Sequence, residues 1–236
     1  MQLIGALVYH VYKALFMRGE TSLRRADTLS KILFIIATIT YFTLSRYYAP
    51  VVLLVVAIVL GIWSNGFKWF SSAGLLALIP SAWYAITSYI VVLLGLPYRL
   101  EPLDIFWIGF RTYSLSILIL LYFTMISSTK LYNILVRLGI NKYAIVPQLI
   151  WRLIPQGLIY VYESLSISSV KRESLRNRLA PAIASIIELG NLTKLNSYYK
   201  IYGIPNNTIP ITTNRKTTLT LYTLTVLTIV LTILKL

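Results

Sequence analysis

Long apolar runs with few charges constrain this chain more than any other feature of its sequence. Hydrophobic residues make up 57% of the 236 residues and charged residues only 12%. An ordinary soluble domain carries about 25% charged residues, and a disordered chain is far less apolar. The composition therefore excludes both classes and indicates a membrane protein. The apolar stretches described next predict that it is all-α and polytopic.

Five apolar stretches are candidates for membrane spans. Residues 32–63 are apolar except for Arg46. A membrane-spanning helix needs about 20 residues, so this stretch is too long for one span and short for two. Their centre, residues 46–50, reads Arg-Tyr-Tyr-Ala-Pro and suits a turn at the headgroup level, where Arg snorkels and Tyr is enriched. We therefore predict two short spans, and three longer ones follow, giving spans at 32–46, 49–63, 73–96, 105–126 and 217–234.

The last span and the connectors need separate arguments. Residues 217–234 alternate with Thr as a strand would, but a lone strand leaves its backbone unpaired in lipid, so a helix is predicted. Residues 65–70 read as an interfacial connector, and 97–104 as a polar loop. Residues 1–17 lack a basic start and a cleavage site, so they predict an interfacial or half-embedded helix and not a signal peptide. Residues 18–31 are polar, with no apolar stripe.

The region 127–215 is too polar to span a membrane, yet it contains helical periodicity. Apolar residues recur at steps of three and four over 141–170 and again over 175–203. These patterns predict two long amphipathic helices, joined around 172–177 and followed by a linker over 206–214. The predicted organisation is an N-terminal segment, four spans, a helical region and a final span, with boundaries at 1–31, 32–126, 127–215 and 216–236.

Charge predicts the orientation. The chain has 22 Lys and Arg against 7 Asp and Glu, a net charge of +15. With five spans and the N-terminus inside, 18 of the basic residues fall inside, and only Arg46, Arg99 and Lys235 fall outside. The positive-inside rule favours this arrangement. We expect a plasma-membrane protein whose N-terminus and 127–215 region are cytoplasmic.

Two positions within the helices attract attention. Arg111 lies in a predicted span, where a charge is costly; it either bridges the bundle or contacts a partner, or it snorkels to the outer interface. Arg152 and Pro155 lie in the segment Trp151-Arg152-Leu153-Ile154-Pro155. Pro155 predicts a bend toward a partner, and the alternative is a plain surface helix with Arg152 on its wet face.

The ends of the two long helices are the candidate partner-binding sites. The first ends in Val170, Lys171 and Arg172, either a cationic tip for an acidic groove or cations that complement the helix dipole. The second ends in Lys200, Ile201, Tyr202 and Gly203, where Gly203 also serves as an ordinary helix stop.

Enzyme motifs are scarce. The sequence has no P-loop and no HExxH, no Cys and a single His. Few carboxylates remain for a two-metal site. We expect a non-catalytic chain with no cofactor and no bound metal, so any ATP hydrolysis would occur in other subunits. Because the chain is so apolar, we expect the lipid bilayer and not nucleic acid as its partner.

The arrangement resembles the transmembrane T component of energy-coupling factor (ECF) transporters, ABC-type importers of vitamins, nickel or cobalt. The segment Ser22–Lys31 is similar to the family's entry segment, Gly109–Thr129 to its Arg-bearing span, and Asn133–Gly139 to the short helix that follows. Trp151–Pro155 matches the family's Leu-Arg-Phe-Ile-Pro most specifically. The family's two coupling helices each end in Ala-Arg-Gly; here these positions are Val170–Arg172 and Ile201–Gly203.

The resemblance implies a transmission element. Two ABC-type ATPase subunits would hold the two helix tips and move them, which would tilt a separate, small, hydrophobic substrate-binding membrane subunit. Lys171 keeps a positive charge but loses the bidentate fork of Arg, and Tyr202 replaces the second Arg, with Lys200 two residues away. The alternatives are a membrane anchor or assembly protein without ATP coupling, and a stand-alone secondary transporter.

Overall fold

The computed structural model describes residues 2–16, 21–45, 47–94, 101–170 and 212–234, with the pairs 180–181, 183–184, 187–188 and 190–191. These residues form helices, turns and coil, and no strand occurs among them. The prediction of an all-α polytopic protein is confirmed. Four described helices are long and apolar enough to cross a membrane: α4 (Tyr48–Asn65), α5 (Phe67–Leu93), α6 (Pro102–Met125) and α11 (Arg215–Ile233).

The chain divides into two compact units. We call Lys13–Met125 with Thr213–Leu236 the span unit, and Met1–Tyr12 with Ile126–Thr212 the α9 unit. The division falls within α1 (Gln2–Leu15). The span unit also holds α2 (Ser22–Arg25) and α3 (Thr28–Leu44), an apolar helix of 17 residues.

The break between α3 and α4 lies at residues 45–47, so it overlaps the start of the turn predicted around residues 46–50, while residues 48–50 belong to α4. Ser45 N donates to Tyr41 O and closes α3. Pro50 lies in the first turn of α4, where its missing N–H removes no helical hydrogen bond. The prediction rested on the cost of placing Arg and Tyr side chains at the centre of a span, and the break between the helices does lie at these residues.

One connector was wrongly predicted. Residues 67–70 belong to α5, which begins at Phe67 and not near Ala73. Gly66 alone joins α4 to α5, and its φ of 81° is a conformation that favours glycine. Gly66 N donates to Ile62 O, which ends α4 tightly enough for α5 to start at the next residue. Pro80 lies inside α5 without ending it.

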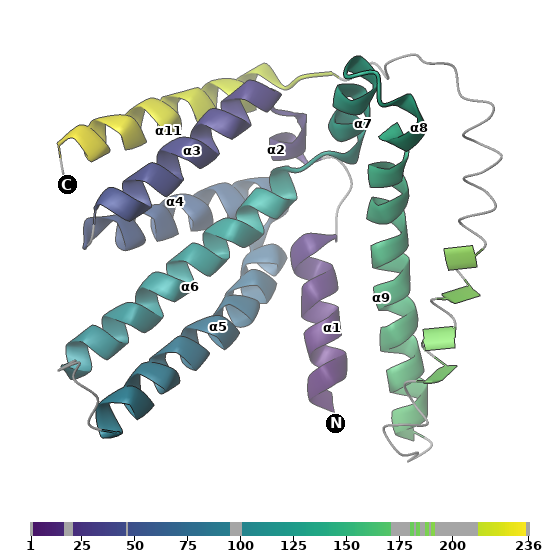
Figure 1. Ribbon diagram of the computed structural model, residues 1–236, viewed down its shortest axis with the longest axis horizontal. Coiled ribbons are helices and arrows are strands. Elements are labelled where there is room, and N and C mark those ends of the chain that lie inside the picture. Colours follow the sequence, from purple (N-terminus) through teal and green to yellow (C-terminus); the bar gives the residue numbers. More distant parts are fainter. Residues whose placement is uncertain are drawn as a thin grey trace. The chain divides into compact units, whose positions relative to one another are not determined.

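Two helix pairs organise the span unit, α5 with α6 and α3 with α11, each running side by side (Figure 1). Small residues allow α5 and α6 to approach closely: Gly109 lies where an added Cβ would be 3.3 Å from Ala85 Cβ. Ser81 Oγ donates across the same contact to Gly109 O at 2.7 Å. Such small-residue packing is typical of membrane helices. The core contains large buried side chains including Phe34, Tyr41, Leu53, Ile117, Leu118, Leu121 and Leu221.

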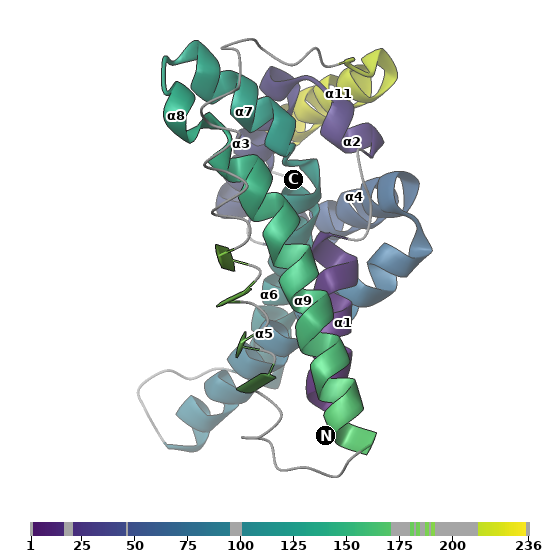
Figure 2. The ribbon, with the colours of Figure 1, turned by 90° about the vertical axis from the view of Figure 1, so that its right-hand side faces the viewer.

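The α9 unit contains the first part of α1, α7 (Ser128–Arg137), α8 (Asn141–Ala144) and α9 (Val146–Val170). Gly139, with φ of 77°, ends α7: Gly139 N donates to Val136 O and Ile140 N to Leu135 O, the two bonds of a Schellman motif. Helix α9 is continuous in both views and runs through Pro155 (Figures 1 and 2). The predicted helix over 141–170 is present, with a short turn at Ile145. The predicted helix over 175–203 falls largely outside the described residues.

Candidate functional site

Arg111 links two helices of the span unit. Its Nη2 donates to Phe42 O at 3.2 Å, and its guanidinium carbon lies 4.8 Å from the centroid of the Phe42 ring. Phe42 lies in the last turn of α3, where carbonyls have no helical donor and the dipole favours a cation. The contact bridges α6 and α3 within the span unit, and the Arg111 side chain is half-buried.

Helix α9 carries the segment Trp151–Pro155. The apolar stripe predicted for this segment is divided: Ile145, the residue before α9, is buried and Leu149, Leu153 and Leu158 are half-buried, whereas Ile150, Ile154 and Tyr162 are exposed. The helix therefore keeps an exposed apolar edge along the length that carries the motif. Pro155 is half-buried, and the side chain of Arg152 lies outside the described part of the structure.

The first part of α1 packs against α9. The rings of Tyr9 and Tyr162 lie with centroids 5.9 Å apart, and a Cβ at Gly5 would be 3.9 Å from Tyr162 Cε2. The ring of His10 lies edge-on to that of Tyr9 at 5.7 Å. These contacts fix one face of α9 within its unit.

The two helix tips fall almost entirely outside the described residues. Val170 is the last residue of α9, so the first tip follows directly from a long helix. Lys171, Arg172, Lys200, Ile201, Tyr202 and Gly203 all lie outside the described residues, and so does the side chain of Val170.

A buried pair of cations at one end of the span unit was missed by sequence reasoning. Lys31 is 6% exposed and its Nζ donates to Arg24 O at 2.7 Å and to Met125 O at 2.8 Å. Arg24 is 8% exposed; its Nε donates to Thr124 O at 3.1 Å, and its Nη2 donates to Leu15 O at 3.5 Å. The two cations thus satisfy carbonyls at the C-terminal ends of α6, α1 and α2, which otherwise lack donors.

The start of α11 joins the same cluster. Asp27 caps α3 by accepting from Leu29 N at 3.2 Å, and Asp27 N donates to Thr218 Oγ1 at 3.0 Å. Asn214 N donates to Arg25 O at 3.2 Å. The segment 21–31, which looked like a featureless polar stretch, therefore connects α3, α6 and α11 through backbone groups. The hydrogen bonds given for Arg24 and Lys31 go to backbone carbonyls, and such partners leave no mark in a sequence.

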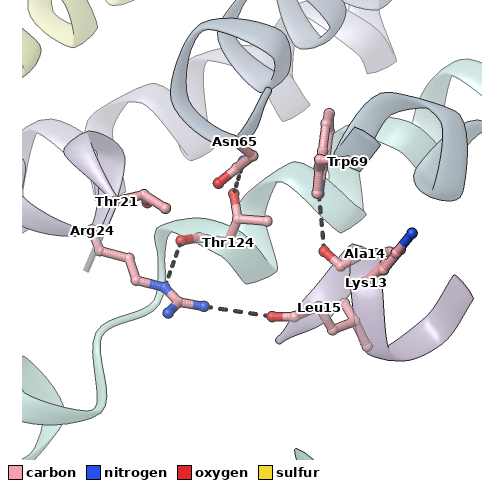
Figure 3. Close-up of a pocket in the computed structure, with 8 residues that line it drawn as sticks. All are labelled: Lys13, Ala14, Leu15, Thr21, Arg24, Asn65, Trp69 and Thr124. Carbon is pink, nitrogen blue, oxygen red and sulfur yellow. Dashed lines mark hydrogen bonds between the residues drawn. The ribbon is translucent and has the colours of Figure 1, made fainter. Parts of the chain in front are cut away.

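A pocket opens beside this cluster (Figure 3). The lining residues come from the end of α1, from α2 and the residue before it, from the α4–α5 corner and from the end of α6: Lys13, Ala14, Leu15, Thr21, Arg24, Asn65, Trp69 and Thr124. Trp69 Nε1 donates to Ala14 O at 2.9 Å, and Asn65 Nδ2 donates to Thr124 Oγ1 at 3.3 Å. All eight residues belong to the span unit.

Around the pocket, the side chains of Lys13, Arg24, Asn65 and Trp69 offer cations and hydrogen-bond donors. Among those residues, no group of three or more His, Cys, Asp or Glu is placed to hold a metal ion. In comparisons with known proteins, no family model, no curated protein and no solved structure matches the chain.

Proposed function

We propose that the chain is the energy-coupling membrane subunit of an ECF-type ABC importer. In this role it transmits movement from two ATPase subunits to a separate membrane subunit that binds a vitamin or a transition metal. The observation that carries the proposal is α9, a 25-residue helix. It bears Trp151-Arg152-Leu153-Ile154-Pro155 and ends at Val170, immediately before the basic pair Lys171-Arg172.

The span unit supports the proposal by its charge distribution. Apart from Arg111, the described basic residues of the span unit gather at the end where α3, α5 and α11 begin and α4 and α6 end: Lys13, Arg24, Arg25, Lys31, Lys68, Arg215 and Lys216. The charged residues described at the start of α6 are instead acidic: Glu101, just before the helix, and Asp104 in its first turn. The positive-inside rule then makes the basic end cytoplasmic, with α3 counted as a fifth, short span.

The mechanism follows from position and charge. Each cationic tip sits in an acidic groove on one ATPase subunit, and closure of the ATPases on ATP moves the tips relative to each other. The first tip offers Lys171 and Arg172, and the second offers Lys200 beside Tyr202. An ammonium is a point charge without the fork of a guanidinium, so the docking rests on charge attraction more than on bidentate hydrogen bonding.

A photocrosslinking experiment tests the proposal. A photoreactive amino acid replaces Lys171 in one variant, Tyr202 in a second and Arg137 in a control, an exposed basic position at the end of α7. In native membranes, positions 171 and 202 should capture an ABC-type ATPase subunit and position 137 should not. Capture of no ATPase from either tip, in a chain that is normally inserted, would overturn the proposal. A chain that anchors soluble proteins without ATP coupling would capture those proteins instead.

A further inference from the structure

The pocket beside Arg24 has the size and polarity of a site for a single oxygen atom of a larger ligand. Its enclosed part has room for about one water-sized group, and it is open on one side. A ligand whose one polar atom enters while its bulk stays outside fits this shape. A small molecule that must be enclosed entirely does not.

The lining contains a buried hydroxyl donor, that of Thr21. Thr21 is 9% exposed, and its Oγ1 has no hydrogen-bond partner among the residues that the structure describes. A buried hydroxyl in this condition loses its hydration without replacement, which costs free energy unless a ligand or water restores a hydrogen bond. Thr21 and Arg24 both line the pocket, and Figure 3 draws them on the same side of it.

The charge around the pocket favours an anion. Lys13 and Arg24 line it, and Lys31 lies directly behind, with its Nζ on the carbonyl of Arg24. The C-terminal carbonyls of α1, which carry the negative end of the helix dipole, already accept hydrogen bonds from the protein: Ala14 O from Trp69 and Leu15 O from Arg24. The hydrogen bonds of Arg24 to Leu15 and Thr124 hold its guanidinium at the pocket before any ligand arrives.

The position within the bundle matches the depth of lipid headgroups. The pocket lies where α6 ends and α5 begins, and Trp69 forms one wall. Tryptophan and basic residues gather at the headgroup level of bilayers, and basic pockets between membrane helices bind anionic headgroups. This holds in either leaflet, so the inference is independent of the orientation and of the coupling role.

We propose that this pocket binds a phosphate group, with one phosphate oxygen accepting from Thr21 Oγ1 and Arg24 and with Lys13 at the rim. The phosphate can belong to an anionic lipid or be free in solution. The anionic lipid and free phosphate both carry the phosphate oxygen that the pocket recognises. Only the lipid also has acyl chains, which can contact the exposed apolar helices.

Ligand-induced thermal stabilisation of the full chain in detergent provides the test. The probes are phosphatidylglycerol, phosphatidylcholine and inorganic phosphate, each titrated against the wild type and two pocket variants, Thr21→Val and Lys13→Gln. The matched controls are Thr43→Val and Lys68→Gln, both at exposed positions outside the pocket. Thr21→Val removes the unpartnered hydroxyl at nearly constant shape. It should leave the unliganded chain at least as stable as the wild type, so that a loss of binding is not a loss of folding.

We expect phosphatidylglycerol to stabilise the wild type and both controls, and its apparent affinity to fall about tenfold in each pocket variant, the effect of one lost charge-assisted contact. Phosphatidylcholine should stabilise less, because its choline opposes the basic lining. Stabilisation by inorganic phosphate to the same extent would assign the site to free phosphate. Equal responses of pocket and control variants, or no response to any probe, would overturn the proposal and leave an ordered water as the occupant.

Discussion

The indole ring of Trp69 lies against the backbone of Gly61, in the space that a side chain at position 61 would occupy. Trp69 is 2% exposed, and its Nε1 donates to Ala14 O. The α4–α5 corner and the end of α1 are therefore held together by one aromatic side chain that only a glycine at position 61 admits.

Replacing Gly61 by Ala should displace the Trp69 ring, because the new methyl group overlaps it. Overpacking of this kind costs about 1–3 kcal/mol, so Gly61→Ala should lower the thermal stability of the purified chain by several degrees. Gly190→Ala is the control, because an added Cβ there meets nothing within 4 Å. Equal stability of the two variants would contradict the packing described for Trp69.

Replacing Lys31 by Met should destabilise the span unit. The substitution leaves the carbonyls of Arg24 and Met125 without this donor in a buried site, at a cost of about 1–3 kcal/mol. Lys68→Met, at an exposed position of the same end, should be nearly neutral. Unfolding of both variants in mixed micelles measures the difference, and a Lys31→Met variant as stable as Lys68→Met would show that the two carbonyls do not depend on Lys31.

A double-mutant cycle separates the two contacts of Arg111. Arg111→Met removes both the hydrogen bond to the Phe42 carbonyl and the contact with the ring, whereas Phe42→Leu removes only the ring. We expect a coupling free energy of about 0.5–2 kcal/mol for the cation–π part, and a larger total loss for Arg111→Met. Strictly additive free energies of unfolding would mean that the ring contributes nothing to the interaction.

Single cysteines test the orientation, since the natural chain has none. A membrane-impermeant maleimide added to intact cells should label Glu101→Cys, at the acidic end of the span unit. It should label Lys68→Cys, at the basic end, only after the membrane is opened. The reverse pattern would place the basic end outside and would remove the coupling helices from the compartment that holds ATP.

The docking role of the first tip predicts the effect of charge reversal. Lys171→Glu should reduce co-purifying ATPase about tenfold or more, because it places like charges at a charge-dependent contact, while membrane insertion stays normal. Arg137→Glu reverses a charge in the same unit, at an exposed position outside the tips, and should leave assembly intact. Undiminished ATPase in the Lys171→Glu preparation would rule out Lys171 as an anchor.

The spans were predictable because their signal is local. Burial in lipid demands apolar runs of known length, and the polar residues at 46–50 interrupt such a run where α3 gives way to α4. The start of α5 was misplaced by six residues, because Lys68 and Trp69 were read as boundary residues. In the structure, Lys68 is exposed at the first turn while Trp69 turns inward to Gly61 and Ala14.

The cation cluster was not predictable for a different reason. Arg24 and Lys31 are buried by contacts with carbonyls about a hundred residues away, at Thr124 and Met125, and every residue type carries a carbonyl. In the sequence, Arg24 and Lys31 are visible only as charged residues, and charged residues are normally predicted to be exposed to solvent. Arg111 was easier, because a charge inside an apolar run must find a partner, although its partner, the last turn of α3, became visible only in the structure.

Affinity purification of the chain from its native membrane in mild detergent tests the central claim most directly, with every co-purifying protein identified. The coupling role predicts ABC-type ATPase subunits together with a small, very hydrophobic membrane protein, whose identity would then indicate the transported substrate. Recovery of the chain alone, even after crosslinking in the membrane, would contradict the coupling role.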